Sequence, residues 1–160
     1  YTANESLTPI EIAQRLKEAI PDKYRDQWVW ITGGEPYDRD LLPLLKVLKQ
    51  EGFSIAVATS GKHRAIHSVD WISVSYHGAY PLVQKYGHEI KLVEGLNGLD
   101  LWEFEKQYPD DQTDFFYRYV QPLSVDGAED KESMERCLEF IKHRPNWSLS
   151  RQDHIVWGVA

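Results

Sequence analysis

The chain has 160 residues, a net charge of −7 and a single cysteine, Cys137. The length favours one domain over residues 1–160, and one cysteine excludes a disulfide framework, a four-thiolate zinc site or a cysteine-ligated iron–sulfur cluster built from this chain alone. The acidic balance argues against nucleic acid and anionic membranes as partners, because both require clustered Lys and Arg.

The first predicted elements alternate between helix and strand. Residues 8–20 are typical of a helix, with Thr8 as its N-cap and Pro9 in the first helical position. The apolar run at 28–31 predicts a buried strand. Leucines at helical spacing then predict a helix over 38–51.

The rest of the chain continues this alternation. Strands are expected at 53–58, 71–74, 89–93, 115–120 and 147–149, and helices at 99–107 and 129–143. The last helix is expected to turn Met134, Cys137, Leu138 and Ile141 inward. Strands separated by helices indicate βαβ units, so the predicted fold class is α/β with mainly parallel strands.

Polar residues collect directly after five of the predicted strands. These segments are 32–36, 59–61, 75–78, 121–124 and 150–154. Because the carboxyl ends of parallel strands face the same way, the five segments should share one rim, where α/β folds bind ligands. Polar loops are common in such folds, so the argument depends on the five segments together.

The segment Thr-Gly-Gly-Glu-Pro at 32–36 carries the sharpest signal. Gly33 and Gly34 allow the backbone to approach a ligand closely. Glu35 adds a carboxylate that can take an ammonium group. A phosphate loop fits poorly, because no Gly-Lys-Ser/Thr follows and a carboxylate repels phosphate. A tight turn with a solvated glutamate is the alternative.

Four stretches resemble one known family in the same order. The motif Gly-Gly-Glu-Pro within 28–61 resembles that of radical S-adenosylmethionine enzymes. With 71–75, 119–124 and the closing Trp-x-Leu-Ser-x-Gln-x-His within 147–160, nearly the whole chain resembles the 7-carboxy-7-deazaguanine synthases. This resemblance implies an abbreviated, partial (β/α) barrel of the radical S-adenosylmethionine type, here with the first strand missing.

The resemblance also implies an activity. The family is a group of carbon–nitrogen lyases that convert 6-carboxy-5,6,7,8-tetrahydropterin to 7-carboxy-7-deazaguanine by radical chemistry, with loss of ammonia, in queuosine biosynthesis. The implied cofactors are S-adenosyl-L-methionine, a [4Fe-4S] cluster and Mg²⁺. The implied partners are a second copy in a homodimer and an electron donor such as flavodoxin. No apolar run approaches the roughly 18 residues of a membrane span, and we expect a cytoplasmic protein.

Site residues follow from the resemblance by position. The cofactor would be bound by Gly33, Gly34, Glu35, Ser75, Tyr76, His77, Gln121, Pro122, Leu123 and Ser124. The substrate would contact Thr32 and, through the terminal carboxylate, Ala160.

Several positions depart from the family pattern. Where the family has Ser-Pro-Lys, this chain has Ser-Tyr-His at 75–77, and Ala58 and Ile155 replace a glutamate and a lysine. The cysteine loop that holds the cluster and the Asp-Thr for Mg²⁺ are missing, and the chain lacks an initiator Met, so we expect a trimmed, catalytically silent piece. Two other hypotheses stay open: a non-catalytic module that binds S-adenosylmethionine or a pterin, and a different radical reaction on a related heterocycle.

Overall fold

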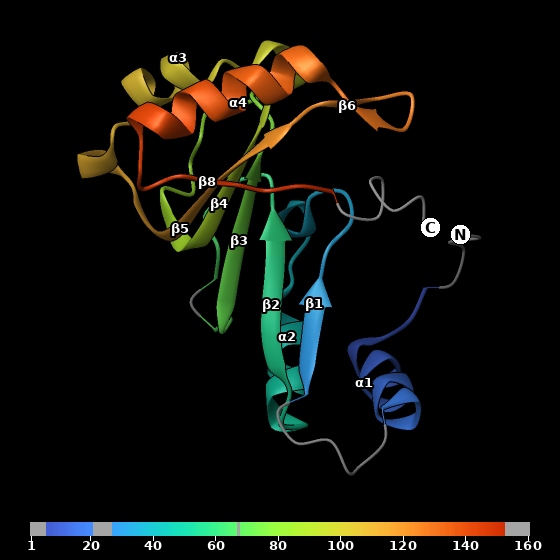
Figure 1. Cartoon of the computed structure of the whole chain (residues 1–160). Coiled ribbons are helices and arrows are strands. Elements are labelled where there is room, and N and C mark those ends of the chain that lie inside the picture. Colours follow the sequence, from blue (N-terminus) through green and yellow to red (C-terminus); the bar gives the residue numbers. More distant parts are fainter. Residues whose placement is uncertain (1–5, 21–26, 67, 153–160) are drawn as a thin grey trace.

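A computed structural model describes residues 6–20, 27–66 and 68–152. Its centre is a six-stranded sheet in the order β1-β2-β3-β4-β5-β8, in which every pair of neighbours is parallel (Figure 1). The strands are β1 (Trp28–Ile31), β2 (Ser54–Thr59), β3 (Trp71–Tyr76), β4 (Tyr86–Glu94), β5 (Asp114–Pro122) and β8 (Ser148–Leu149). A short antiparallel hairpin is formed by β6 (Ser124–Val125) and β7 (Ala128–Glu129). The predicted α/β class is confirmed.

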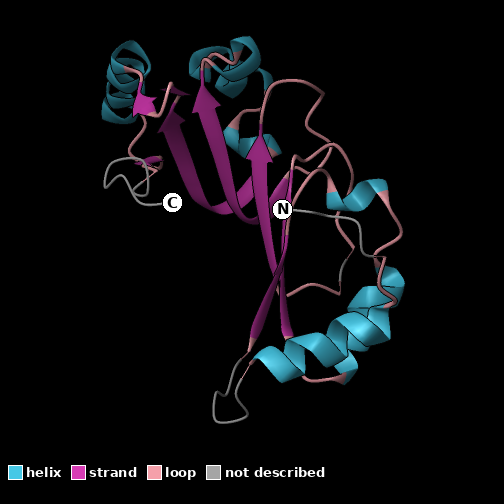
Figure 2. Ribbon diagram, turned by 90° about the vertical axis from the view of Figure 1, so that its right-hand side faces the viewer, coloured by secondary structure: helices cyan, strands magenta, loops and turns pink. Residues whose placement is uncertain are grey.

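The helices are α1 (Pro9–Ala19), α2 (Leu42–Gln50), α3 (Leu101–Gln107) and α4 (Lys131–His143), with short 3-10 turns η1 (Pro36–Asp38), η2 (Leu96–Gly98) and η3 (Asp110–Gln112) (Figure 2). Helices α2 and α4 pack directly on the strands, α1 packs on α2, and α3 contacts α4. The predicted start of α1 is confirmed. The Glu11 amide donates to Thr8 Oγ1 at 3.3 Å, and the Thr8 amide donates back to the Glu11 carboxylate at 2.7 Å. Among the described residues, no helix is both long and apolar enough to cross a membrane.

Side chains alternate between the two faces of the sheet. The rows Val57–Ile72, Val74–Ile90 and Leu92–Val120 are buried on the face that the helices cover. The neighbouring rows contain Ala58–Ser73 and Ser75–Lys91, which lie on the opposite face because successive residues of a strand point to opposite sides. We call this second side the open face.

Two helices differ from their predictions. The helix expected over 38–51 begins at Leu42, because residues 36–38 form η1, with the Glu35 side chain accepting from the Tyr37 amide. In α4 the buried residues are Ser133, Cys137 and Phe140, so the prediction that Leu138 turns inward is wrong; it is 39% exposed. Ser133 occupies the inner position because its hydroxyl donates to the Glu94 carbonyl at 2.9 Å and accepts from the Leu123 amide at 2.8 Å.

The turn after β2 generates a stability prediction. Gly61 has φ +81°, and a Cβ there would lie 2.6 Å from Leu82 Cδ1 and 3.0 Å from Val74 Cγ1, both in the core. We expect Gly61→Ala to lower the free energy of unfolding by about 3 kcal/mol, from a left-handed backbone and overpacking together. Urea denaturation measures it. Gly127→Ala is the matched control, because φ there is +78° with nothing within 4 Å, and should cost about 1 kcal/mol. Equal losses would contradict the packing argument.

Candidate functional site

The carboxyl ends of the strands border two adjoining cavities on the open face. The central cavity, about 480 Å³, is lined by residues of β1 to β4 and their following loops, and the lateral cavity, about 310 Å³, extends toward β5 and the closing segment. Ser75, His77 and Lys91 line both. Residues from all five predicted polar segments line one cavity or the other, so the prediction of a shared rim is confirmed.

The residues assigned by resemblance distribute unevenly around these cavities. The central cavity is lined by Thr32, Gly33, Gly34, Ser75 and His77, and the lateral cavity by Gln121, Leu123, Ser124 and again Ser75 and His77. Glu35 borders a third cavity, of about 560 Å³, on the other side of the glycine turn. Ala160 lies outside the described residues.

Two assigned residues lie apart from the cavities on the open face. The Tyr76 side chain is buried on the helical side, 5.4 Å from the Phe104 ring centroid and 6.0 Å from that of Tyr108. Burial and the neighbouring Tyr108 raise its pKa to about 12. Pro122 pairs with Glu94 at the end of β5 and lines neither cavity. A ligand on the open face therefore meets Ser75 and His77, on either side of Tyr76, rather than the tyrosine ring.

The Glu35 carboxylate joins the loops that follow β1 and β2. It accepts hydrogen bonds from Thr59 Oγ1 and the Ser60 amide at 2.8 Å each, from the Ser60 hydroxyl, and from the Tyr37 amide at 3.1 Å. These four donors match the roughly four lone-pair sites of a carboxylate. Glu35 therefore fixes the shape of the glycine turn, and a ligand ammonium group would have to replace one of its donors.

The glycine turn presents bare backbone to the cavities. Gly33 and Gly34 have φ values of +93° and +59°, in the region that other residues rarely adopt. A Cβ built on either would have nothing within 4 Å, so the space beside the turn is open. The turn can accept a ligand against its amide and carbonyl groups.

His77 is a neutral group at pH 7. Burial and then the positive charge of Lys91 both lower its pKa below the usual 6.5. Its carbonyl accepts from Asn97 Nδ2 at 2.9 Å, which fixes the backbone beyond β3. The imidazole can donate or accept a hydrogen bond, but it does not supply the positive charge of the lysine found there in the family pattern.

Sequence reasoning missed Trp30, Glu89 and Lys91, which line the central cavity. Trp30 is 53% exposed on the open face, two residues before Thr32. Glu89 and Lys91 lie opposite Ser73 and Ser75 of β3. The period-two alternation of β4 was the available signal, but it needs the pairing register to show which residues face the cavity.

The closing segment is held at the rim by three contacts. The Ser150 amide donates to the Val120 carbonyl at 2.8 Å, and Ser124 Oγ donates to Gln152 Oε1 at 2.7 Å. Arg151 makes two hydrogen bonds to the Glu129 carboxylate, at 3.1 and 3.2 Å. The β6–β7 hairpin therefore orients the segment that leads to the end of the chain.

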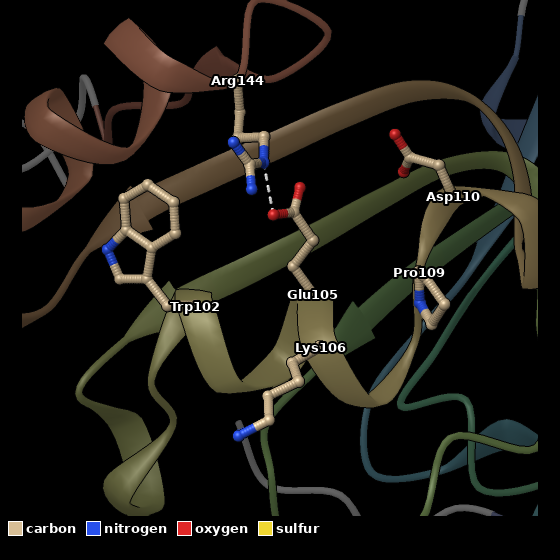
Figure 3. A pocket seen from close by; sticks show the side chains of 6 residues that line it. All are labelled: Trp102, Glu105, Lys106, Pro109, Asp110 and Arg144. Atoms are coloured by element: carbon tan, nitrogen blue, oxygen red, sulfur yellow. Dashed lines mark hydrogen bonds and ion pairs between the residues drawn. The ribbon is translucent and has the colours of Figure 1, made fainter.

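A further pocket, of about 390 Å³, lies on the helical side between α3 and the end of α4 (Figure 3). Its charged groups are already paired. Arg144 binds the Glu105 carboxylate and lies 5.1 Å from the Trp102 ring centroid, and Asp110 accepts from Arg118 and from Asn146. This pocket is a structural junction away from the rim.

The chain's own residues do not fit the iron–sulfur cluster. Cys137 lies on the buried side of α4, and burial raises its pKa to about 12. One protonated thiol away from the rim is no cluster ligand, since such clusters are held by several thiolates. Within the described ranges, no three His, Cys, Asp or Glu side chains are grouped so as to hold a metal ion.

Comparisons with known proteins place this rim within a class. No family model matches the chain. The crystal structure of QueE from Escherichia coli superposes with a TM-score of 0.62 and 27% identity, over 94% of this chain and 68% of that one. The fold is therefore the α/β fold of a radical S-adenosylmethionine protein.

The curated relatives narrow the class to one family. The chain is 31% identical to the 7-carboxy-7-deazaguanine synthase of Bradyrhizobium diazoefficiens, over 94% of this chain and 68% of the relative. It is 35% identical to that of Burkholderia multivorans, over 83% of this chain and 60% of the relative. The chain belongs to the 7-carboxy-7-deazaguanine synthase family. It spans only 60% to 69% of the length of the relatives it matches.

The hydrogen bonds of Glu35 generate a pH prediction. Burial raises the pKa of its carboxyl, but the bonds from Ser60, Thr59 and Tyr37 outweigh this and leave the pKa below its usual 4.5. The ionised Glu35 carboxylate therefore stabilises the fold at pH values above 4.5, and this stabilisation is lost as the pH falls through the lower pKa of the folded state. We expect Glu35→Gln to lower the free energy of unfolding by about 1 kcal/mol at neutral pH. The deficit should shrink below about pH 4.

Urea midpoints of both proteins, measured from about pH 7 down to pH 3, check this. Glu135→Gln, at an exposed position of α4, is the control and should follow the wild type throughout. A deficit that does not depend on pH would show that the charge of Glu35 is unimportant.

Proposed function

We propose that the two cavities bind S-adenosylmethionine and 6-carboxy-5,6,7,8-tetrahydropterin, and that the protein serves in the conversion of this pterin to 7-carboxy-7-deazaguanine. The observation that carries the proposal is the meeting of Gly34, Ser75 and Gln121 at one rim, in a chain of this family. Bound together, the cofactor and a reduced cluster supply the radical that starts such reactions.

The chain's own residues would bind the two ligands and orient them at the rim. The open backbone at Gly33 and Gly34 suits the methionine part of the cofactor, and Ser75 and His77 offer hydrogen bonds to its adenosyl part. Gln121 to Ser124 would border the same ligand from β5. Thr32 would face the pterin. Ala160, the other residue expected at the substrate, lies outside the described residues.

The cluster sets a limit on what these 160 residues do. Cys137 is their one thiol, and it is buried on the far side of the sheet from the cavities. We infer that cluster ligands come from outside this sequence and that the chain by itself binds ligands without turnover. A homodimer, bound Mg²⁺, a flavodoxin-like electron donor and a cytoplasmic location are further expectations from the family.

A second candidate function rests on the same single cysteine. A protein that binds S-adenosylmethionine or the pterin without catalysis needs the rim but no cluster. Turnover by a form that carries the cluster separates the two functions.

Turnover is tested by anaerobic reconstitution with iron and sulfide, using QueE from Escherichia coli as the positive control. We expect the 160-residue chain to bind both ligands in calorimetry, yet to give no 7-carboxy-7-deazaguanine by mass spectrometry. Product formation by the chain would contradict the inference about the cluster. An absence of binding would contradict the proposed function itself.

Gly34→Ala tests the binding mode. Its methyl group would project into the open space beside the turn, so we expect S-adenosylmethionine affinity to fall about tenfold or more. Gly52→Ala is the matched control, because φ there is +86° with nothing within 4 Å, at the end of α2 rather than at the rim. Calorimetric affinities that are equal for both variants would remove Gly34 from the cofactor site.

A further inference from the structure

The strand β4 places two opposite charges on the open face. Glu89 and Lys91 lie two positions apart, so both side chains leave the same side of the strand. Glu89 pairs with Ser73 and Tyr117, and Lys91 with Ser75 and Tyr119. Both are half-buried and line the central cavity, and Lys91 reaches the lateral cavity as well.

Neither charge has a counter-ion in the part of the chain that the structure describes. No ion pair or hydrogen bond to another described residue involves the Lys91 ammonium or the Glu89 carboxylate. Some lysines elsewhere have an acidic partner: Lys62 contacts Asp38 at 3.1 Å, and Lys49 contacts Asp70. A half-buried ammonium group loses part of its hydration, and no acidic side chain of the described residues is bonded to Lys91 in exchange. An anionic ligand would restore that loss.

The surroundings leave Lys91 as the anion site of the cavities. Of the described residues that line the two cavities, Lys91 alone carries a permanent positive charge. His77 is neutral at pH 7, partly because Lys91 lies near it. Ala58 contributes no charge, and the Glu35 carboxylate is satisfied by its four donors.

We propose that Lys91 Nζ binds a ligand carboxylate at this rim, and that Glu89 accepts a hydrogen bond from an N–H group of the same ligand. The two residues are about 7 Å apart along the strand, so together they orient a ligand with its carboxylate toward the rim. The proposal rests on the proposed function, because both ligands named there carry one carboxylate. The shared chemistry is a charge-assisted bond between ammonium and carboxylate.

Four ligands distinguish the two sources of the carboxylate. They are S-adenosylmethionine, its decarboxylated analogue, 6-carboxy-5,6,7,8-tetrahydropterin and tetrahydropterin without the 6-carboxylate. Each is titrated calorimetrically into the wild type and into Lys91→Met. The ligands form two pairs, each with and without its carboxylate: S-adenosylmethionine with its decarboxylated analogue, and the two pterins. For one of these pairs, we expect loss of the ligand carboxylate and loss of the Lys91 ammonium each to weaken binding about tenfold to a hundredfold. The two losses together should weaken it little more than either alone. That pair identifies the carboxylate.

Three further variants keep the test interpretable. Lys91→Gln, which preserves polarity, should repeat the result if Lys91→Met folds poorly by circular dichroism. Lys46→Met, at an exposed position of α2, should bind all four ligands as the wild type does. Glu89→Gln should lower the binding affinity for the identified ligand and for its analogue without the carboxylate by the same factor.

Two outcomes overturn the proposal in different ways. If the wild type binds the ligands and the Lys91 variants bind all four equally well, the carboxylate anchor is wrong and the proposed function stands. If the wild type binds neither S-adenosylmethionine nor the carboxylated pterin, the proposed function fails and the anchor fails with it.

Discussion

Five parallel strand pairings bring the carboxyl ends of six strands to one rim, and the lining of the two cavities there depends on this register. The register also separates the faces: Val57, Val74 and Leu92 pack under the helices, while Ser75 and Lys91 stay on the open side. A slip of one residue in any strand would move its polar set into the core, where unpaired polar groups are costly. The apolar face therefore fixes the positions of side chains that it never touches.

The glycine turn and Glu35 act as one unit. Positive φ values at Gly33 and Gly34 open the backbone toward the cavity, but a glycine pair alone has many accessible conformations. The Glu35 carboxylate removes that freedom by binding the β2 loop through Thr59 and Ser60. Glu35 was predicted to bind a ligand, but its carboxylate oxygens instead accept the hydrogen bonds that hold the turn in shape. The positive charge available to an anion is supplied instead by Lys91, from a strand in the middle of the sheet.

Much of the fold was predictable because its signals are local. Apolar runs mark β1, β2 and β3, and the capping residues Thr8 and Glu11 mark the start of α1. The rim segments were predictable because each follows a strand directly. The cavity-lining Lys91 was not, since its role depends on pairing with Ser75 across the sheet. Helical periodicity likewise marked the inward face of α4 but missed Ser133. Its hydroxyl makes two hydrogen bonds at the carboxyl ends of β4 and β5, and these offset the cost of burying a polar group.

Ser75 of β3 and Gln152 form part of one wall of the lateral cavity. Gln152 is held there by a hydrogen bond from Ser124 of the β6–β7 hairpin. Contacts between such distant positions form late, because the closure entropy of the intervening chain is lost before they stabilise anything. Segments held by a few exposed polar contacts are also the first to open in a folded protein. We therefore expect this wall to open more readily than the core of the sheet. Proteolysis or hydrogen exchange at Ser150 to Gln152 would register its opening while the sheet is still intact.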